Sequence, residues 1–274
     1  MSEGEGSSTY PSSAGYARIN GLNLYYEVHG TGQPLVLLHG GLLTIDLTFG
    51  GILPALAATR QVVALELQGH GHTGDIDREP ALRYLADDVV GLLDHLGIGR
   101  ADLFGFSLGG LTALQLAVTR PARVHRLVLA STHYRPEGYH PEILDPYARP
   151  GSPRMPTERD FQEMYEAYVE VAPDPDRFEA FAEKLRPTVR RFEGWSAETL
   201  AGLAAPVLLL VGDTDFVRLE HAVEMHGLIP GSQLGVLPGT THHNLPRRAD
   251  LVVPMVEAFL TPPPEPVPPP SSAG

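Results

Sequence analysis

The sequence predicts an α/β fold, in which a mainly parallel sheet is flanked by helices. Short apolar runs alternate with longer amphipathic segments along most of the chain. Several of these runs consist largely of Val and Leu without polar alternation, as expected of strands that are buried on both faces. One such run, Ala101–Phe104, leads through a glycine-rich turn into an amphipathic segment, Leu108–Thr119.

The short apolar runs define the predicted strands, and the amphipathic segments between them define the predicted helices. In chain order the strands are Leu22–Val28, Pro34–Leu38, Val62–Leu67, Ala101–Phe104, Val124–Ala130, Val207–Val211 and Gln233–Leu237. The helices are Leu82–Leu96, Leu108–Thr119, Leu219–Leu228 and Leu245–Phe259.

One segment breaks the alternation of strands and helices. Residues 134–203 contain no convincing strand, but they contain helical stretches at Thr157–Val171 and Pro175–Arg191. We therefore expect a core of residues 16–133 and 204–260, with residues 134–203 forming a helical lid at one edge of the sheet. The Gly/Ser-rich residues 1–15 and the proline-rich residues 261–274 are expected to be disordered.

Composition excludes several classes of partner. The formal net charge of -13 disfavours binding to nucleic acid or to anionic membranes. The absence of cysteine excludes disulfides, thiolate metal sites and a cysteine nucleophile. Residues 1–15 lack the basic start and apolar run of a signal peptide, and no stretch approaches the roughly eighteen apolar residues of a membrane helix. We therefore expect a cytoplasmic protein.

The strongest chemical signal is the G-x-S-x-G motif Gly105-Phe106-Ser107-Leu108-Gly109. It lies between a predicted strand and a predicted helix, the context in which a sharp turn exposes a nucleophilic serine. Serine is a weak nucleophile at its ordinary pKa and needs a base and an acid from elsewhere in the chain. Carboxylates at Asp213 and Asp215, and imidazoles at His242 and His243, follow two later predicted strands.

Together these segments resemble the α/β-hydrolase superfamily, in its serine esterase and cofactor-free haloperoxidase-like branch, over about residues 16–260. The matching pieces are His39-Gly40-Gly41, Gln68-Gly69-His70-Gly71-His72-Thr73, the serine motif, Gly212–Asp215 and Gly239–His242. The resemblance implies an eight-stranded sheet with the lid inserted after strand 6. Its usual spacings imply Asp215 as the acid and His242 as the base, with Asp213 and His243 as the second choices.

The resemblance also implies an oxyanion hole made by the backbone N–H groups of Leu108 and Gly41, with Leu42 as the alternative to Gly41. Relatives carry an aspartate where this chain has Glu66-Leu67-Gln68, which places Gln68 near the cleft. Candidate substrate contacts are Leu42, Gln68, Tyr134, Trp195 and His243. No metal and no cofactor are expected, since His70 and His72 lack the spacing of a zinc site.

The function expected from these residues is hydrolysis of a carboxylic ester or lactone of a small, apolar substrate through an acyl-enzyme on Ser107. The alternatives are thioesterase, perhydrolase or haloperoxidase activity, and a small-molecule receptor that keeps the three residues without turnover. An aspartate nucleophile, as in epoxide or haloalkane hydrolases, is excluded by the serine at position 107.

Overall fold

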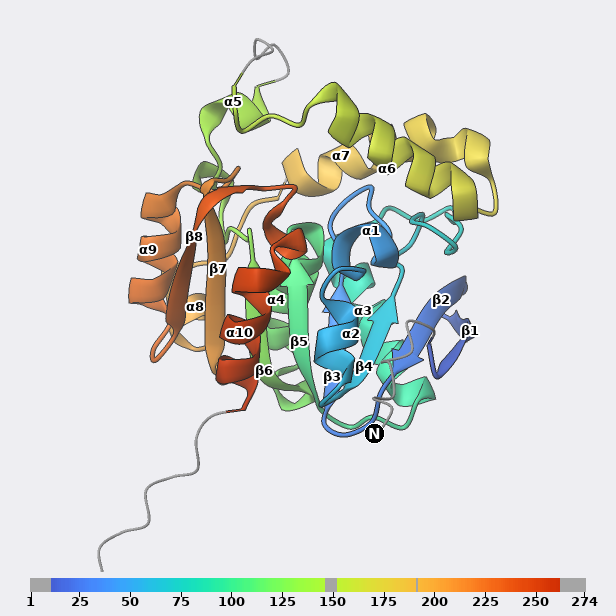
Figure 1. Ribbon diagram of the computed structural model, residues 1–274, viewed down its shortest axis with the longest axis horizontal. Helices are drawn as coiled ribbons and strands as arrows, with labels where there is room; N and C mark the ends of the chain where they lie inside the picture. The colour runs from blue at the N-terminus through green and yellow to red at the C-terminus, as the bar shows by residue number, and fades with distance from the viewer. Residues whose placement is uncertain (1–10, 146–151, 191, 262–274) are drawn as a thin grey trace, which may run out of the picture.

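The computed structural model describes residues 11–145, 152–190 and 192–261 and contains an eight-stranded sheet with strand order β1-β2-β4-β3-β5-β6-β7-β8 (Figure 1). Strand β2 is antiparallel to both β1 and β4, and all other neighbouring strands are parallel. The predicted mainly parallel α/β sheet is therefore confirmed. The strands are β1 Ser13–Ile19, β2 Leu22–His29, β3 Pro34–Leu38, β4 Gln61–Leu65, β5 Ala101–Phe106, β6 Val124–Ala130, β7 Val207–Thr214 and β8 Gln233–Thr241.

Helices cover both faces of the sheet, so each central strand is buried on two sides. Alternate residues of β3 show this, because Val36 and Leu38 belong to one apolar cluster whereas Leu35 and Leu37 belong to another. The first cluster packs under α3 (Leu82–His95), α4 (Leu108–Thr119), α8 (Ala197–Ala201) and α9 (Leu219–Leu228), and the second under α1 (Ile45–Phe49), α2 (Leu53–Ala57) and α10 (Ala249–Leu260). Two-sided burial is the reason why these strands read as continuous Val and Leu runs.

Between β6 and β7 the chain forms a helical segment that lies over the carboxyl ends of the strands (Figure 1). It contains α5 (Pro141–Leu144), α6 (Glu158–Val171) and α7 (Phe178–Arg190). Helix α6 starts at a capping box in which Thr157 and Asp160 bond to each other's backbone N–H groups. Helix α8 does not share this position, because its Leu200 is buried against the sheet.

The structure differs from the sequence-based prediction at both ends. Strand β1 was not predicted, and it starts at Ser13, inside the segment expected to be disordered. Its signal is weak because only Ala17 and Ile19 are buried and Tyr16 faces solvent. The predicted helix Leu245–Phe259 is divided by Arg248 into a 3₁₀ turn, Leu245–Arg247, and α10. Residues 1–10 and 262–274, where disorder was expected, lie outside the described residues.

No helix within the described ranges is long and apolar enough to cross a membrane.

Candidate active site

Ser107 lies in the turn between β5 and α4 with a left-handed backbone, at φ 52° and ψ -115°. This conformation is strained for a residue with a side chain, and the surrounding glycines make it sterically possible. A Cβ at Gly105 would lie 2.3 Å from the carbonyl oxygen of Gly109, and one at Gly109 would lie 2.0 Å from that of Leu38. The two glycines of the motif are therefore required by the close approach of backbone segments.

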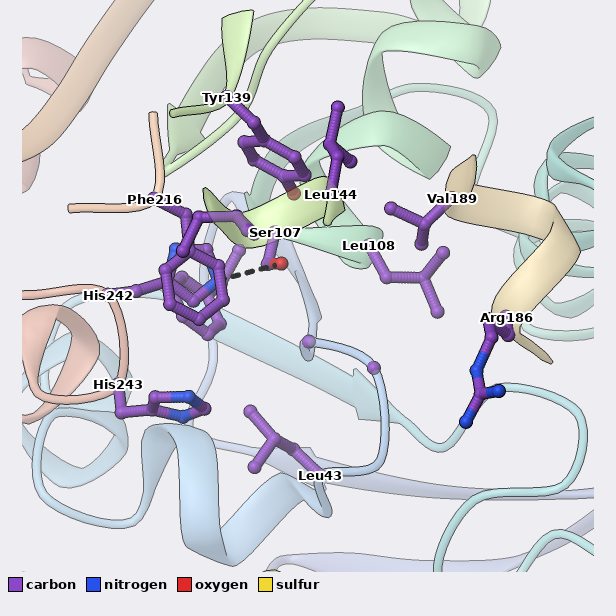
Figure 2. A pocket seen from close by; sticks show the side chains of 14 residues that line it. Leu43, Ser107, Leu108, Tyr139, Leu144, Arg186, Val189, Phe216, His242 and His243 are labelled. Carbon is purple, nitrogen blue, oxygen red and sulfur yellow. Dashed lines mark hydrogen bonds between the residues drawn. The ribbon is translucent and has the colours of Figure 1, made fainter. Parts of the chain in front are cut away.

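The side chains of Ser107, His242 and Asp215 form a continuous hydrogen-bonded chain. The Ser107 Oγ lies 3.0 Å from His242 Nε2, and His242 Nδ1 lies 2.7 Å from Asp215 Oδ1 (Figure 2). These residues directly follow β5, β8 and β7, so the carboxyl ends of parallel strands bring them together. The structure thus joins the three residues that the family spacings indicated.

Asp215 is buried and held by several donors. Its Oδ2 accepts hydrogen bonds from the Ser131 hydroxyl at 2.5 Å and the Gly212 N–H at 3.2 Å, and its Oδ1 accepts one from the Val217 N–H at 3.3 Å. Burial alone would raise the pKa of Asp215, but the His242 charge and these donors hold it below its usual value. The carboxylate is therefore ionised at neutral pH and can orient the imidazole.

Asp213, the alternative acid, has a different role. Its exposed carboxylate accepts hydrogen bonds from the backbone N–H groups of Gly239 at 2.8 Å and Thr240 at 3.0 Å. These bonds lower the pKa of Asp213 and tie the end of β7 to the turn that carries His242. Asp213 therefore acts on the position of the histidine loop, whereas Asp215 contacts the imidazole itself.

Aromatic rings fix the plane of the His242 imidazole. Phe216 stacks on it with ring centroids 3.8 Å apart and an interplanar angle of 6°, and Phe106 approaches it at 5.0 Å. Phe216 follows Asp215 directly, so one segment supplies both the acid and the stacking surface. Packing thus fixes the plane of the His242 ring, and the Asp215 carboxylate fixes its tautomer.

A cavity of about 210 Å³ opens in front of Ser107 (Figure 2). The core contributes the loop residues Gly40, Gly41 and Leu43 together with Leu108. A Cβ at Gly41 would lie 3.9 Å from the Cβ of Leu108, so the two residues proposed as oxyanion donors are neighbours at this wall. Leu108 is the first residue of α4, where the backbone N–H has no partner within the helix.

Four candidate substrate contacts from the sequence do not line this cavity. The Leu42 side chain, on a residue with φ 62°, packs on the apolar core. Gln68 is fully buried, donating to Asp75 and accepting from Arg78. Tyr134 stacks on His221, and Trp195 packs on Phe192 at the far side of α7.

His243, the remaining candidate, does line the cavity. Burial and the neighbouring His242 lower the pKa of His243 to about 4, so its imidazole is neutral at neutral pH. It therefore adds a polar but uncharged surface beside the base.

The sequence-based reasoning missed most of the cavity wall. Six further residues line it: Tyr139, Ile143, Leu144, Arg186, Val189 and Phe216. Tyr139 lies in an irregular stretch, Ile143 and Leu144 lie on the four-residue helix α5, and Arg186 and Val189 lie on α7. Periodicity therefore gave no sign of which side chains face the serine. Phe216 could have been found from its position directly after Asp215.

The described residues contain no cluster of three or more His, Asp or Glu side chains that could hold a metal ion. His70 is buried in packing contacts with His39 and Phe181, and His72 pairs with Glu66 at 2.9 Å. These contacts hold the loops that follow β3 and β4.

The serine lies on a strained strand-to-helix turn above a mainly parallel sheet, and it is hydrogen-bonded to a histidine that is itself hydrogen-bonded to a buried aspartate. This is the arrangement of the serine hydrolases with this fold. Residues 33–186, more than half of the chain, match the family described as alpha/beta hydrolase fold. The chain belongs to this family of hydrolases.

Individual relatives are similar over different shares of the chain. Human serine hydrolase BPHL is 29% identical over 253 residues, covering 88% of this chain and 84% of that protein. The dihydrolipoyllysine-residue acetyltransferase component of the acetoin cleaving system of Pseudomonas putida is 41% identical over 116 residues, which cover 39% of this chain and 29% of that protein. The enol-lactonase structure from Burkholderia xenovorans LB400 superimposes with a TM-score of 0.72 at 26% identity, covering 89% and 99% of the two chains.

Proposed function

We propose that this protein hydrolyses carboxylic esters or lactones of small, apolar substrates through an acyl-enzyme on Ser107. The observation that carries the proposal is the hydrogen-bonded chain from Ser107 through His242 to Asp215 at the base of a largely apolar cavity. The likeness to a serine hydrolase and to an enol-lactonase supports the same class of reaction.

In the first half-reaction, His242 Nε2 accepts the Ser107 proton while the Oγ attacks the substrate carbonyl carbon. The Asp215 carboxylate stabilises the imidazolium that forms and keeps its Nδ1–H directed away from the serine. The negative charge on the carbonyl oxygen is held by the backbone N–H groups of Leu108 and Gly41. Each such donor typically contributes roughly 10²–10³ in rate.

The tetrahedral intermediate then collapses, the carbon–oxygen bond to the alcohol breaks, and His242 returns its proton to the leaving oxygen. Water enters the vacated position, His242 removes one of its protons, and the hydroxide adds to the acyl carbon. Release of the acid restores the Ser107 hydroxyl. In a lactone the alcohol and the acid belong to the same molecule, so ring opening gives a single hydroxy acid.

The cavity wall favours an apolar acyl group of modest size. Leu43, Leu108, Ile143, Leu144 and Val189 supply aliphatic surface, and the volume of about 210 Å³ is below the roughly 300–1,000 Å³ of sites for drug-sized ligands. Short aliphatic or single-ring substrates therefore fit the site better than long-chain lipids.

We further propose that the segment between β6 and β7 is the lid of this site and that α7 is its anchored part. Phe181 fills the space left by Gly69 and packs against His70, while Lys184 donates to Asp75 at 2.7 Å. Thr188 donates to the Pro80 carbonyl at 3.0 Å. The cavity-lining residues of α7 are thus held to the core by apolar, ionic and hydrogen-bond contacts.

The test is hydrolysis of p-nitrophenyl acetate and butyrate by the wild type and by Ser107→Ala, with circular dichroism to confirm that both are folded. We expect turnover by the wild type and loss of at least about 10³-fold in the variant, because residual catalysis then rests on the oxyanion hole and binding alone. A fluorophosphonate probe should label the wild type at Ser107. A folded wild type that binds a ligand without turnover would instead support the receptor alternative.

A further inference from the structure

The phenol of Tyr139 lies beside the nucleophile on a wall that no motif of the sequence predicted. Tyr139 is buried and lines the same cavity as Ser107. Figure 2 shows its oxygen directed toward Ser107, with Leu43 of the glycine loop on the opposite side of the serine. His242 approaches the Ser107 hydroxyl from a third direction.

Tyr139 is fixed by the segment that also carries the acid. Its backbone pairs with Val217 in an antiparallel bridge, and the neighbouring His140 N–H donates to the Phe216 carbonyl at 2.9 Å. The Val217 N–H in turn donates to Asp215. On its other side the phenol ring packs on His133, with centroids 4.0 Å apart. The position of the hydroxyl relative to the triad is therefore set by backbone and ring contacts.

The proton positions leave the Tyr139 phenol as a hydrogen-bond donor to a molecule bound in the cavity. Asp215 accepts the Nδ1–H of His242, so Nε2 is an acceptor and takes the one hydrogen of the Ser107 hydroxyl. Burial and the Asp215 charge raise the pKa of Tyr139, although the neighbouring Ser107 hydroxyl opposes them. The neutral phenol therefore keeps its hydrogen and can donate it to a group bound beside Ser107 Oγ.

Building on the proposed ester hydrolysis, we infer that Tyr139 is a further catalytic residue that donates a hydrogen bond to the leaving-group oxygen. In the proposed mechanism the oxyanion points toward Gly41 and the start of α4. Figure 2 shows the phenol across the serine from Leu43, which belongs to the same loop as Gly41. The group on the phenol's side is the alcohol oxygen, which departs beside His242. The carbon–oxygen bond breaks, His242 Nε2 delivers the proton, and Tyr139 retains its own.

This role predicts a dependence on the leaving group. A p-nitrophenolate disperses its charge and departs with little assistance, whereas an ethoxide carries its charge on one oxygen. Tyr139→Phe should lower kcat/KM for ethyl butyrate by about 10- to 100-fold, the effect of one hydrogen bond to a charged group. For p-nitrophenyl butyrate, which forms the same acyl-enzyme, the loss should stay near threefold or less.

The matched control is Tyr168→Phe, which removes a buried phenol whose partner is the Asp174 carbonyl at 3.3 Å, away from the serine. This variant should leave both substrates within about twofold of the wild type. Equal losses of kcat/KM on the two esters in Tyr139→Phe would assign the residue to packing and overturn the inference. Unchanged kinetics in this variant would also overturn the inference, as would a wild type that cleaves the aryl ester but not the ethyl ester.

Failure of the proposed function gives a different pattern. In that case neither ester is hydrolysed by the wild type, or Ser107→Ala retains full activity. Either outcome would overturn the inference together with the serine mechanism, whereas a Ser107-dependent enzyme with no leaving-group effect would overturn the inference alone.

Discussion

Replacing Asp215 by Asn should invert the tautomer of His242. The two oxygens of the carboxylate face different donors: Oδ2 accepts from Ser131 and Gly212, whereas Oδ1 accepts from His242 and Val217. An amide NH₂ group would meet a backbone N–H at either position, that of Gly212 at Oδ2 or that of Val217 at Oδ1. With the NH₂ group facing His242, as the same substitution places it in serine proteases, Nδ1 becomes an acceptor and Nε2 carries the hydrogen.

With Nε2 protonated, His242 can no longer accept the Ser107 proton. The corresponding change in a serine protease with a Ser-His-Asp triad lowers kcat by about 10⁴-fold, or about 5.5 kcal/mol in activation free energy, without moving the side chains. We expect a similar loss for Asp215→Asn, measured as kcat for p-nitrophenyl butyrate at neutral pH. Binding of the substrate, and hence KM, should change little, because the cavity wall is unaltered.

Asp213→Asn is the matched control, since it makes the same chemical change two residues earlier. Its exposed carboxylate accepts hydrogen bonds from the backbone N–H groups of Gly239 and Thr240 and from the Thr214 hydroxyl, and solvent can replace part of these interactions. We expect kcat to fall by less than about tenfold. A larger loss in Asp213→Asn than in Asp215→Asn would refute the assignment of the acid.

Two further predictions concern stability. Gly105→Ala should lower the free energy of unfolding by about 3 kcal/mol or more, because the new Cβ meets the Gly109 backbone. Gly227→Ala, in open space on α9, should raise the free energy of unfolding by about 0.5–1 kcal/mol. Urea titration measures both changes, and equal effects would contradict the packing argument. The pKa of Asp215 is lowered in the folded state, so at acid pH the folded state binds fewer protons than the unfolded state. The resulting contribution to the free energy of unfolding is complete above the pKa of the unfolded state. It is lost as the pH falls through the pKa of the folded state. The melting temperature of the wild type should therefore fall more steeply below pH 4 than that of Asp215→Asn, and parallel curves would exclude this linkage.

The three residues of the proposed triad could be predicted because each follows a buried strand. Continuous Val and Leu runs locate β5, β7 and β8, and the carboxyl ends of parallel strands share one edge, so Ser107, Asp215 and His242 had to lie near each other. The choice between Asp213 and Asp215 needed family spacing. In the structure it rests on a difference that the sequence does not carry, since one carboxylate points into the core and the other toward the backbone of the histidine loop.

The cavity wall could not be predicted, because it depends on how an irregular segment packs. Gln68 and Tyr134 looked available for substrate, yet both are buried and hydrogen-bonded within the protein. Trp195 is half-buried and packs on Phe192, away from the serine. Tyr139 follows a 3₁₀ turn and has no periodic neighbours, so only the pairing of its backbone with Val217 places its phenol at the serine.

The backbone bridge between Tyr139 and Val217 also has a consequence for protein engineering. Exchanging the segment after β6 for that of a relative is a natural way to alter substrate range, and the end of β6 suggests itself as the crossover point. A chimera joined there would remove the residues that brace the acid loop. Crossover points placed after His140 would keep this brace and still replace Ile143, Leu144, Arg186 and Val189, which line the cavity.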